Sequence, residues 1–129
     1  MPLKCLIIED ATFMREIYRY VLANNPDIEI VGEAGDGEEA VKLLFDLKPD
    51  LMLIDLVLPL KSGLDILKEL SLISPNTKTI VVSSIEEEKI IAKTKALGVL
   101  SYIKKPFTKA DLVKAFDEAT RHYSEVQNG

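Results

Sequence analysis

The sequence predicts an α/β protein: a doubly wound sheet of five parallel strands in the order 2-1-3-4-5, flanked by five helices. Short aliphatic runs alternate five times with longer stretches of helical period, which favours parallel strand and helix units over hairpins. Several of these runs are followed by an acid, a hydroxyl or a lysine, and open parallel sheets bind ligands outside the carboxyl ends of their strands. Asp55, directly after the apolar run 51–54, is the clearest example.

The predicted strands are runs rich in leucine, isoleucine and valine. An uninterrupted apolar run such as 51–54 is typical of a strand that is covered on both faces of a parallel sheet. Right-handed crossovers and one reversal of strand order place the first and third strands side by side. In chain order, the predicted strands are residues 4–8, 28–34, 51–54, 79–82 and 101–103.

Helical periodicity and turn residues define the helices between the strands. The first helix ends before Asn25-Pro26, because the residue that precedes a proline disfavours the helical conformation. Asp36 and Glu39 have the spacing of a capping pair for the second helix. The apolar positions at helical spacing in the first three helices are Phe13, Ile17, Tyr20 and Val21, then Ala40, Val41, Leu44 and Leu47, then Leu64, Leu67, Leu70 and Ile73.

The last two helices are marked by their ends. The fourth is expected to follow Ser83-Ser84, with the acidic run 86–88 in its first turn and Gly98 as a left-handed cap just beyond its end. Thr108 and Asp111 form a capping pair for the fifth helix, whose apolar positions are Leu112, Phe116, Ala119 and Tyr123. Residues 1–124 are therefore expected to form one domain, and residues 125–129 a frayed tail.

Composition excludes several classes of protein. The formal net charge of −5 argues against direct binding of nucleic acid, which needs a basic face. The single cysteine, Cys5, rules out an internal disulfide and is expected in the core. The first apolar run is too short for a secretory signal, and the longest, residues 51–60, is too short to insert in a membrane. We therefore expect a cytoplasmic protein.

Three carboxylates are expected to meet at one edge of the sheet. Glu9 and Asp10 follow the first strand as Asp55 follows the third, and these strands are predicted neighbours. Three like charges in one cleft favour a bound cation. Two further polar side chains follow the remaining strands: Ser83 ends the fourth, and Lys105 comes shortly after the fifth.

The set Glu9, Asp10, Asp55, Ser83 and Lys105, with Pro106 after the lysine, resembles the receiver domain of bacterial response regulators. The similarity extends from Leu3 to about Tyr123 and implies the flavodoxin-like fold already predicted. Residues 10–15 look like the stand-alone regulators of chemotaxis, known as CheY-like proteins. Residues 31–34 also occur in receivers joined to DNA-binding domains, so a receiver excised from a longer effector protein is the alternative.

The resemblance implies a role for each site residue. Asp55 accepts a phosphoryl group from a phosphohistidine of a sensor histidine kinase. Mg²⁺ is held by Asp10, Asp55 and the backbone carbonyl of Val57, with Glu9 acting through water. Lys105 pairs with a phosphoryl oxygen as a point charge.

The resemblance also implies a switch. Ser83 bonds another phosphoryl oxygen, and the aromatic ring of Tyr102 turns inward as Ser83 moves. The surface of the fourth helix, fifth strand and fifth helix then binds a downstream protein target, and the protein is a monomer or a phosphorylation-dependent dimer. A cis peptide bond is expected between Lys105 and Pro106.

The chain departs from the family's pattern at positions near the site, and other protein classes are alternatives. Val57 and Ile85 are apolar at positions that influence water access in this family, so we expect slow self-dephosphorylation. The implied chemistry is the protein's own phosphorylation, so we expect no conventional turnover enzyme. A haloacid-dehalogenase-type phosphatase requires a second aspartate at the position of Val57. A flavodoxin requires a glycine-rich phosphate loop after the first strand, where Glu9 and Asp10 would repel the flavin phosphate. A phosphorylation-independent interaction module is a further alternative. Singly, Glu9 and Asp10 could only cap the first helix, and Tyr102 could be an ordinary strand aromatic.

Overall fold

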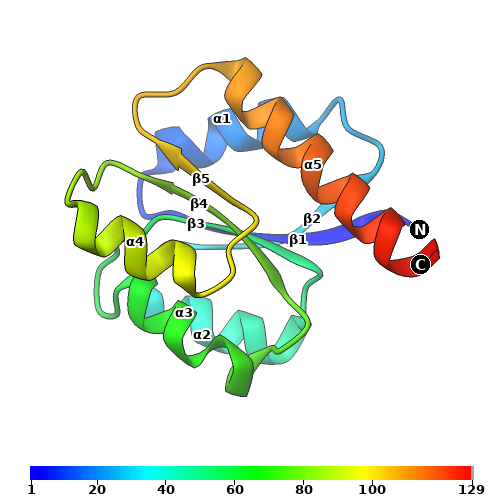
Figure 1. Ribbon diagram of the computed structural model, residues 1–129. Coiled ribbons are helices and arrows are strands. Elements are labelled where there is room, and N and C mark those ends of the chain that lie inside the picture. The colour runs from blue at the N-terminus through cyan, green and yellow to red at the C-terminus, as the bar shows by residue number, and fades with distance from the viewer. Residues whose placement is uncertain (129) are drawn as a thin grey trace.

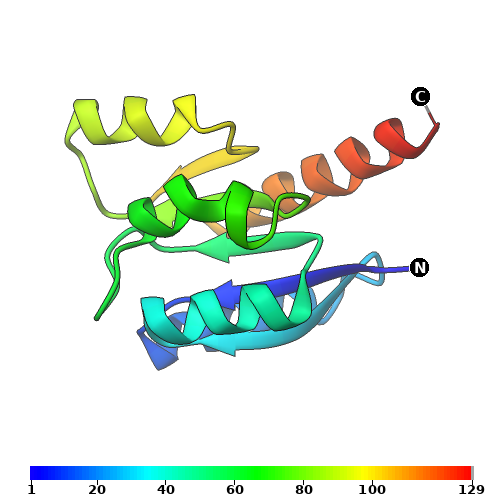
Figure 2. The same cartoon turned by 90° about the horizontal axis from the view of Figure 1, so that it is seen from below.

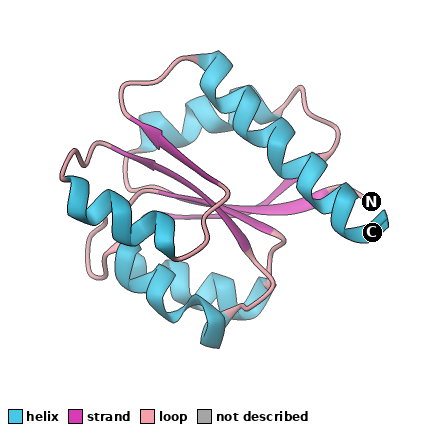
Figure 3. Cartoon of the chain, in the orientation of Figure 1, coloured by secondary structure: helices cyan, strands magenta, loops and turns pink. Residues whose placement is uncertain are grey.

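The computed structural model describes residues 1–128, and side chains up to residue 125. Its centre is one five-stranded sheet in the order β2-β1-β3-β4-β5, with every neighbouring pair parallel (Figures 1 and 3). The predicted strand order is confirmed. The strands are β1 (Leu3–Ile8), β2 (Ile28–Ala34), β3 (Leu51–Ile54), β4 (Lys78–Ser83) and β5 (Ser101–Lys104).

Five helices cover the two faces of this sheet. α1 and α5 lie on one face, and α2, α3 and α4 lie on the other (Figure 1); the view from below shows α2 and α3 in front of the strands (Figure 2). The helices are α1 (Thr12–Leu22), α2 (Gly37–Leu47), α3 (Gly63–Ile73), α4 (Glu88–Ala96) and α5 (Lys109–Asn128). The five helices and the layered architecture agree with the prediction.

Each face of the sheet has its own hydrophobic core, because successive strand side chains point to opposite faces. On β1, Cys5 and Ile7 pack with α1 and α5, whereas Leu6 and Ile8 pack with α2 and α3. The buried Cys5 is a core residue as predicted, and burial raises the pKa of its thiol to about 12.

Three predicted helix ends are confirmed. The Asp36 carboxylate accepts from the backbone N–H of Glu39 at 2.8 Å. Thr108 and Asp111 each accept from the other's backbone N–H, at 3.2 and 2.8 Å, which is a reciprocal capping box. Gly98 follows α4 with φ +85°, a left-handed conformation that glycine adopts without a Cβ clash.

Two helix boundaries differ from the prediction. α4 begins at Glu88 and not directly after Ser83-Ser84, because the hydroxyl of Ser83 accepts from the N–H of Ile85 and continues a turn. Only Glu88 of the acidic run lies in the first turn. α5 continues to Asn128 where a frayed end was expected, since no glycine or proline interrupts residues 109–128. Gly129 lies outside the described residues.

On α1 the buried side differs from the apolar positions picked out in the sequence. Tyr18, Val21 and Leu22 are buried, whereas Phe13 and Tyr20 are largely exposed. Within residues 1–128, none of the helices combines the length and apolar character needed to cross a membrane.

Candidate functional site

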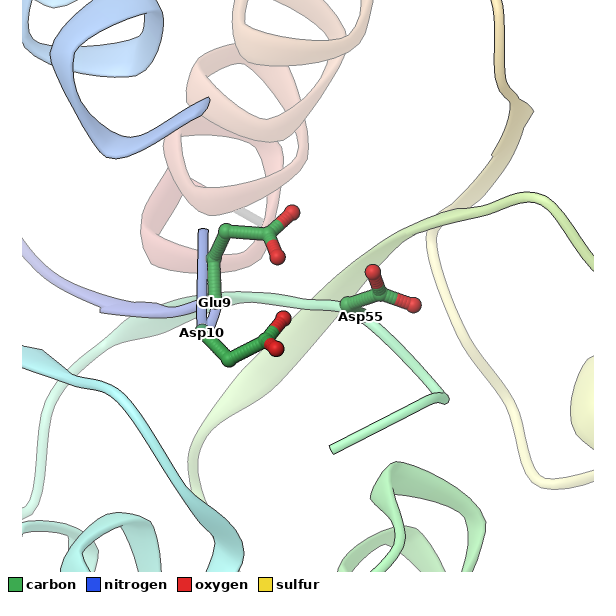
Figure 4. A group of neighbouring side chains, drawn as sticks. All are labelled: Glu9, Asp10 and Asp55. Carbon is green, nitrogen blue, oxygen red and sulfur yellow. The ribbon is translucent and has the colours of Figure 1, made fainter. Parts of the chain in front are cut away.

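The predicted acids meet at the carboxyl ends of β1 and β3. Ile8 and Ile54 are register partners, so the residues that follow them, Glu9 and Asp55, lie side by side. The backbone N–H of Asp55 donates to the carbonyl of Ile8 at 3.1 Å, which locks this junction. Figure 4 shows the carboxylates of Glu9, Asp10 and Asp55 around a common space. The strand order reverses here, which is where open α/β sheets bind ligands.

The three carboxylates differ in exposure. Glu9 is 1% exposed and Asp55 is 7% exposed, whereas Asp10 is exposed to solvent. One oxygen from each can be chosen so that all three lie within 4.8 Å of one another. Ligand oxygens around a six-coordinate Mg²⁺ lie about 3 to 4 Å apart, and carboxylates are the ligands this cation prefers. The donor set therefore fits a magnesium ion with a small inward movement.

Lys105 places one positive charge between the two buried carboxylates. Its Nζ lies 2.8 Å from Glu9 Oε1 and 2.7 Å from Asp55 Oδ2, so it donates to both. The sequence interpretation gave this lysine to a phosphoryl oxygen. In the structure this lysine bridges the residues that follow β1 and β3.

The pKa values of this group reflect burial and pairing. Burial raises the pKa of Glu9, and the hydrogen bond and charge of Lys105 offset only part of that rise. Burial alone would lower the pKa of Lys105, but hydrogen bonds to Asp55 and Glu9 outweigh it and hold this pKa above its ordinary value. The lysine is therefore positively charged at neutral pH.

Backbone groups fix the carboxylates in place. The N–H of Val57 donates to Asp55 Oδ1 at 3.0 Å, and the N–H of Ala11 donates to Glu9 Oε2 at 3.3 Å. Both oxygens of Glu9 are therefore engaged by protein donors, which fits an indirect role toward a metal. The carbonyl of Val57 as a metal ligand stays a prediction.

Gly63 and Arg15 support the site and were not predicted. A Cβ on Gly63 would lie 2.4 Å from the carbonyl oxygen of Asp55, so only glycine lets α3 start this close to β3. Its position directly after Ser62, whose hydroxyl caps α3, was a sequence signal that could have identified it. Arg15 donates to the backbone carbonyl of Glu9 at 2.6 Å and thereby ties α1 to the end of β1.

The predicted switch residues lie beside the acids. Ser83 is fully buried at the end of β4, and the N–H of Lys105 donates to its carbonyl at 2.9 Å. The hydroxyl of Tyr102 is buried with no hydrogen-bond partner, so the ring is turned inward. Burial raises the pKa of this hydroxyl, and the nearby Ser83 side chain lowers it in part. The expected cis bond joins Lys105 and Pro106.

Tyr18 is a second buried tyrosine beside the acids, and the sequence interpretation missed it. Its side chain is 1% exposed, and its hydroxyl has no hydrogen-bond partner. Burial raises the pKa of this hydroxyl, and the charges of Glu9 and Asp55 raise it further. The helical spacing of α1 allowed either Tyr18 or Tyr20 on the inner side, and only the structure decides.

Comparison with known proteins agrees with this arrangement. The sequence pattern of a family described as the response regulator receiver domain matches residues 5–117. The chemotaxis protein CheY of Thermotoga maritima is 33% identical over 121 residues, which are 94% of this chain and the whole of that protein. The transcriptional regulatory protein PdtaR of Mycobacterium tuberculosis is 33% identical over 128 residues, or 98% of this chain and 60% of that protein.

Solved structures agree as well. The REC domain of AraT, a response regulator from Geobacillus stearothermophilus, superposes with a TM-score of 0.89 at 30% identity, covering 98% of this chain and 99% of that one. The receiver domain of the putative response regulator NarL from Mycobacterium tuberculosis gives 0.84 at 23% identity, covering 93% and 97%, which shows the fold alone. None of these similarities supports the phosphatase alternative.

Proposed function

The chain belongs to the response regulator receiver domain family, and on that basis we propose that it is a phosphoacceptor that uses Asp55 and Mg²⁺ to receive a phosphoryl group from a sensor histidine kinase. The observation that carries the proposal is the contact of one partly buried lysine with two buried carboxylates at the switch point of the sheet. This arrangement orients the Asp55 carboxylate through a charge-assisted hydrogen bond from Lys105.

The transfer itself is a displacement at phosphorus. A carboxylate oxygen of Asp55 forms the new P–O bond as the P–N bond of the phosphohistidine breaks, and the imidazole keeps that electron pair and takes up a proton from water. Asp10 and Asp55 would hold Mg²⁺, with Glu9 behind them, and the ion would supply positive charge that offsets the repulsion between the carboxylate and the phosphoryl oxygens. The N–H of Val57 orients the Asp55 carboxylate through its Oδ1.

Lys105 then exchanges partners. In the proposed phosphorylated state its ammonium group contacts a phosphoryl oxygen in place of the carboxylates it bridges here, because the phosphoryl group carries nearly two negative charges. Ser83 donates to another phosphoryl oxygen. The Ser83 hydroxyl then gives up the hydrogen bond that it now accepts from the N–H of Ile85, and the β4-α4 loop moves inward.

This movement reaches a surface through Tyr102. The hydroxyl of Tyr102 is buried without a hydrogen-bond partner, so no hydrogen bond opposes a change in the position of its ring when Ser83 moves. We propose that the surface of α4, β5 and α5 binds the downstream protein target differently in the two states.

Within the family, we propose a stand-alone regulator of chemotaxis type, cytoplasmic and without conventional enzyme turnover. Support comes from CheY of Thermotoga maritima, which this chain matches over that protein's whole length, and from a CheY of Listeria monocytogenes at 32% identity over 99% of its length. A receiver within a longer regulator is the second candidate, which the similarity to part of PdtaR favours.

A phosphorylation assay tests the proposal. The protein is incubated with acetyl phosphate and Mg²⁺, and its intact mass is measured for the wild type, Asp55→Asn and Asp46→Asn. Asp46 is an exposed acid on α2 and serves as the matched control. We expect one phosphoryl adduct on the wild type and the control and none on Asp55→Asn. An equal adduct on Asp55→Asn, or none on the wild type, would contradict the assignment.

A further inference from the structure

The ring of Tyr18 is held in one place by its neighbours. It is buried in the core between the sheet, α1 and α5, and it stacks on Phe107 with ring centroids 6.3 Å apart and planes 20° apart. Phe107 comes two residues after Lys105, so the loop that carries the site lysine also packs against the ring of Tyr18. The ring therefore cannot swing its hydroxyl out to solvent.

The Tyr18 hydroxyl is close enough to Glu9 for that charge to raise its pKa, but it makes no hydrogen bond in the structure. Burial raises the pKa of Tyr18, and Glu9 raises it further both by its charge and as a hydrogen-bond acceptor. The hydroxyl nevertheless lacks any partner at hydrogen-bonding geometry. A phenylalanine would fill the same apolar space without an unpaired polar atom. The buried hydroxyl of Tyr18 is therefore best explained by a second state of the protein in which it forms a hydrogen bond.

The second state follows from the partners of Glu9. At present Glu9 Oε1 accepts from Lys105 and Oε2 accepts from the N–H of Ala11. When Lys105 moves to a phosphoryl oxygen, Oε1 loses its donor while the carboxylate stays 1% exposed. A buried carboxylate oxygen without a donor is strongly unfavourable, and Tyr18 offers a buried hydroxyl that has no partner and whose pKa Glu9 raises.

We propose that Tyr18 is a positioning residue that replaces Lys105 as the hydrogen-bond donor to Glu9 when the lysine binds the phosphoryl group. This inference rests on the proposed phosphoacceptor function. In it, the lysine leaves without exposing or protonating Glu9, and Glu9 keeps the orientation that its indirect role toward Mg²⁺ requires. The hydroxyl retains its proton throughout, since it acts only as a donor.

The test uses beryllium fluoride with Mg²⁺ as a stable mimic of the phosphoryl group. Its affinity is measured by titration calorimetry for the wild type, Tyr18→Phe and Tyr20→Phe. Tyr20 is the matched control, because it lies on the same helix with its side chain 67% exposed. We expect Tyr18→Phe to bind about ten-fold more weakly, since a hydrogen bond to a charged acceptor is lost only in the bound state. Tyr20→Phe should bind like the wild type.

A readout without the mimic separates this role from a structural one. Tyr18→Phe should unfold at the same temperature as the wild type, or higher, when no mimic is present, because its hydroxyl is unpaired in that state. A purely structural role predicts the opposite: a lower unfolding temperature and unchanged affinity for the mimic. By NMR, the Tyr18 hydroxyl proton should move downfield when Mg²⁺ and beryllium fluoride are added to the wild type.

The outcomes distinguish the two proposals. If the wild type does not bind beryllium fluoride with Mg²⁺, the phosphoacceptor function falls and the exchange of donors falls with it. If the wild type binds and Tyr18→Phe binds equally well, the function stands and the role of Tyr18 is wrong. A hydroxyl proton that stays in place on binding also contradicts the exchange.

Discussion

The two ends of the sheet differ in whether their buried polar groups have hydrogen-bond partners. At the amino end, before β3 and β4, Thr77 donates to the carbonyl of Pro49 at 2.6 Å and shares a 2.6 Å hydrogen bond with the hydroxyl of Ser74. The hydroxyl of Tyr123 donates to the carbonyl of Asp50 and, at 3.2 Å, to that of Asn76. The hydroxyls of Ser74, Thr77 and Tyr123 therefore all have hydrogen-bond partners.

At the carboxyl end, the same sheet buries two carboxylates and one lysine, and leaves the hydroxyls of Tyr18 and Tyr102 unpaired. Among the described side chains these two hydroxyls are the buried polar atoms without a partner. A complete network stabilises one arrangement, whereas charges and spare donors allow a second. The amino end therefore serves folding, and the carboxyl end keeps capacity for a ligand.

The largest expected effect is the loss of Lys105. Lys105→Met leaves Glu9 and Asp55 buried without their cation, and should lower the free energy of unfolding by about 3 kcal/mol at pH 7. Urea unfolding measures this. Lys104→Met, at the exposed neighbour on β5, is the matched control and should cost little. An equal loss in the two variants would contradict the role of Lys105 as a buried counter-charge.

The loss in Lys105→Met should depend on pH. The hydrogen bond and charge of Lys105 lower the pKa of Glu9, so removing them lets burial raise this pKa further above its ordinary 4.5. A raised folded-state pKa disfavours the ionised form, so the deficit is small below the raised wild-type pKa of Glu9 and grows as the pH rises above it. In the wild type the raised pKa of Lys105 works the other way: its contribution is complete below 10.5 and is lost above its folded pKa.

The next effect breaks the complete network at the amino end. Thr77→Val keeps the volume of the side chain but leaves the carbonyl of Pro49 and the hydroxyl of Ser74 without their bonds to Thr77. We expect a loss of about 2 kcal/mol in the free energy of unfolding. Ser71→Ala, on the exposed side of α3, is the control. Affinity for beryllium fluoride with Mg²⁺ should be unchanged, and a large change there would break the division between the two ends.

The sequence was sufficient for the fold because local signals agreed with one another. Apolar runs, proline at the helix ends and two capping pairs defined the elements, and the acids after β1 and β3 then had to meet. The start of α4 was predicted too early, because a serine at a strand end can cap a helix or make a tight turn. Here the Ser83 hydroxyl bonds to Ile85, and the turn prevails.

Tyr18 and Lys105 show what the sequence could not determine in the site. Helical period placed Tyr20 among the inward positions of α1, but the structure buries Tyr18, which stacks on Phe107, and exposes Tyr20. The sequence also placed Lys105 near the acids without showing that it contacts both of them. Contacts between residues far apart in sequence depend on side-chain packing, which local patterns do not encode.

At the carboxyl end, Val57 should set how long a phosphoryl group lasts. Its side chain is 55% exposed beside Asp55 and has no polar atom to orient an attacking water. Val57→Asn should speed the loss of the phosphoryl adduct about five-fold, because the amide can position a water molecule. Intact mass followed over time measures the rate, with Val113→Asn on α5 as the control. Equal rates for wild type and Val57→Asn would remove the apolar side chain as the reason for slow loss.

The smallest effect compares backbone strain at the two ends. Lys48, which caps α2 toward the amino end, has φ 44°, and Leu60, in the loop after β3, has φ 69°; among the described residues these are the non-glycine positions in the left-handed region. Lys48 has compensating contacts, since its Nζ donates to the carbonyl of Ile73 and lies 4.5 Å from the ring centroid of Phe45. The side chain of Leu60 is 72% exposed.

Leu60→Gly should therefore raise the free energy of unfolding by about 0.5 kcal/mol, because relief of the left-handed strain exceeds the entropy that glycine adds to the unfolded chain. Lys48→Gly relieves similar strain but loses both side-chain contacts, so it should give no gain. Urea unfolding of the two variants decides the matter. A gain at Lys48 equal to that at Leu60 would mean that the side-chain contacts of Lys48 do not compensate for its backbone strain.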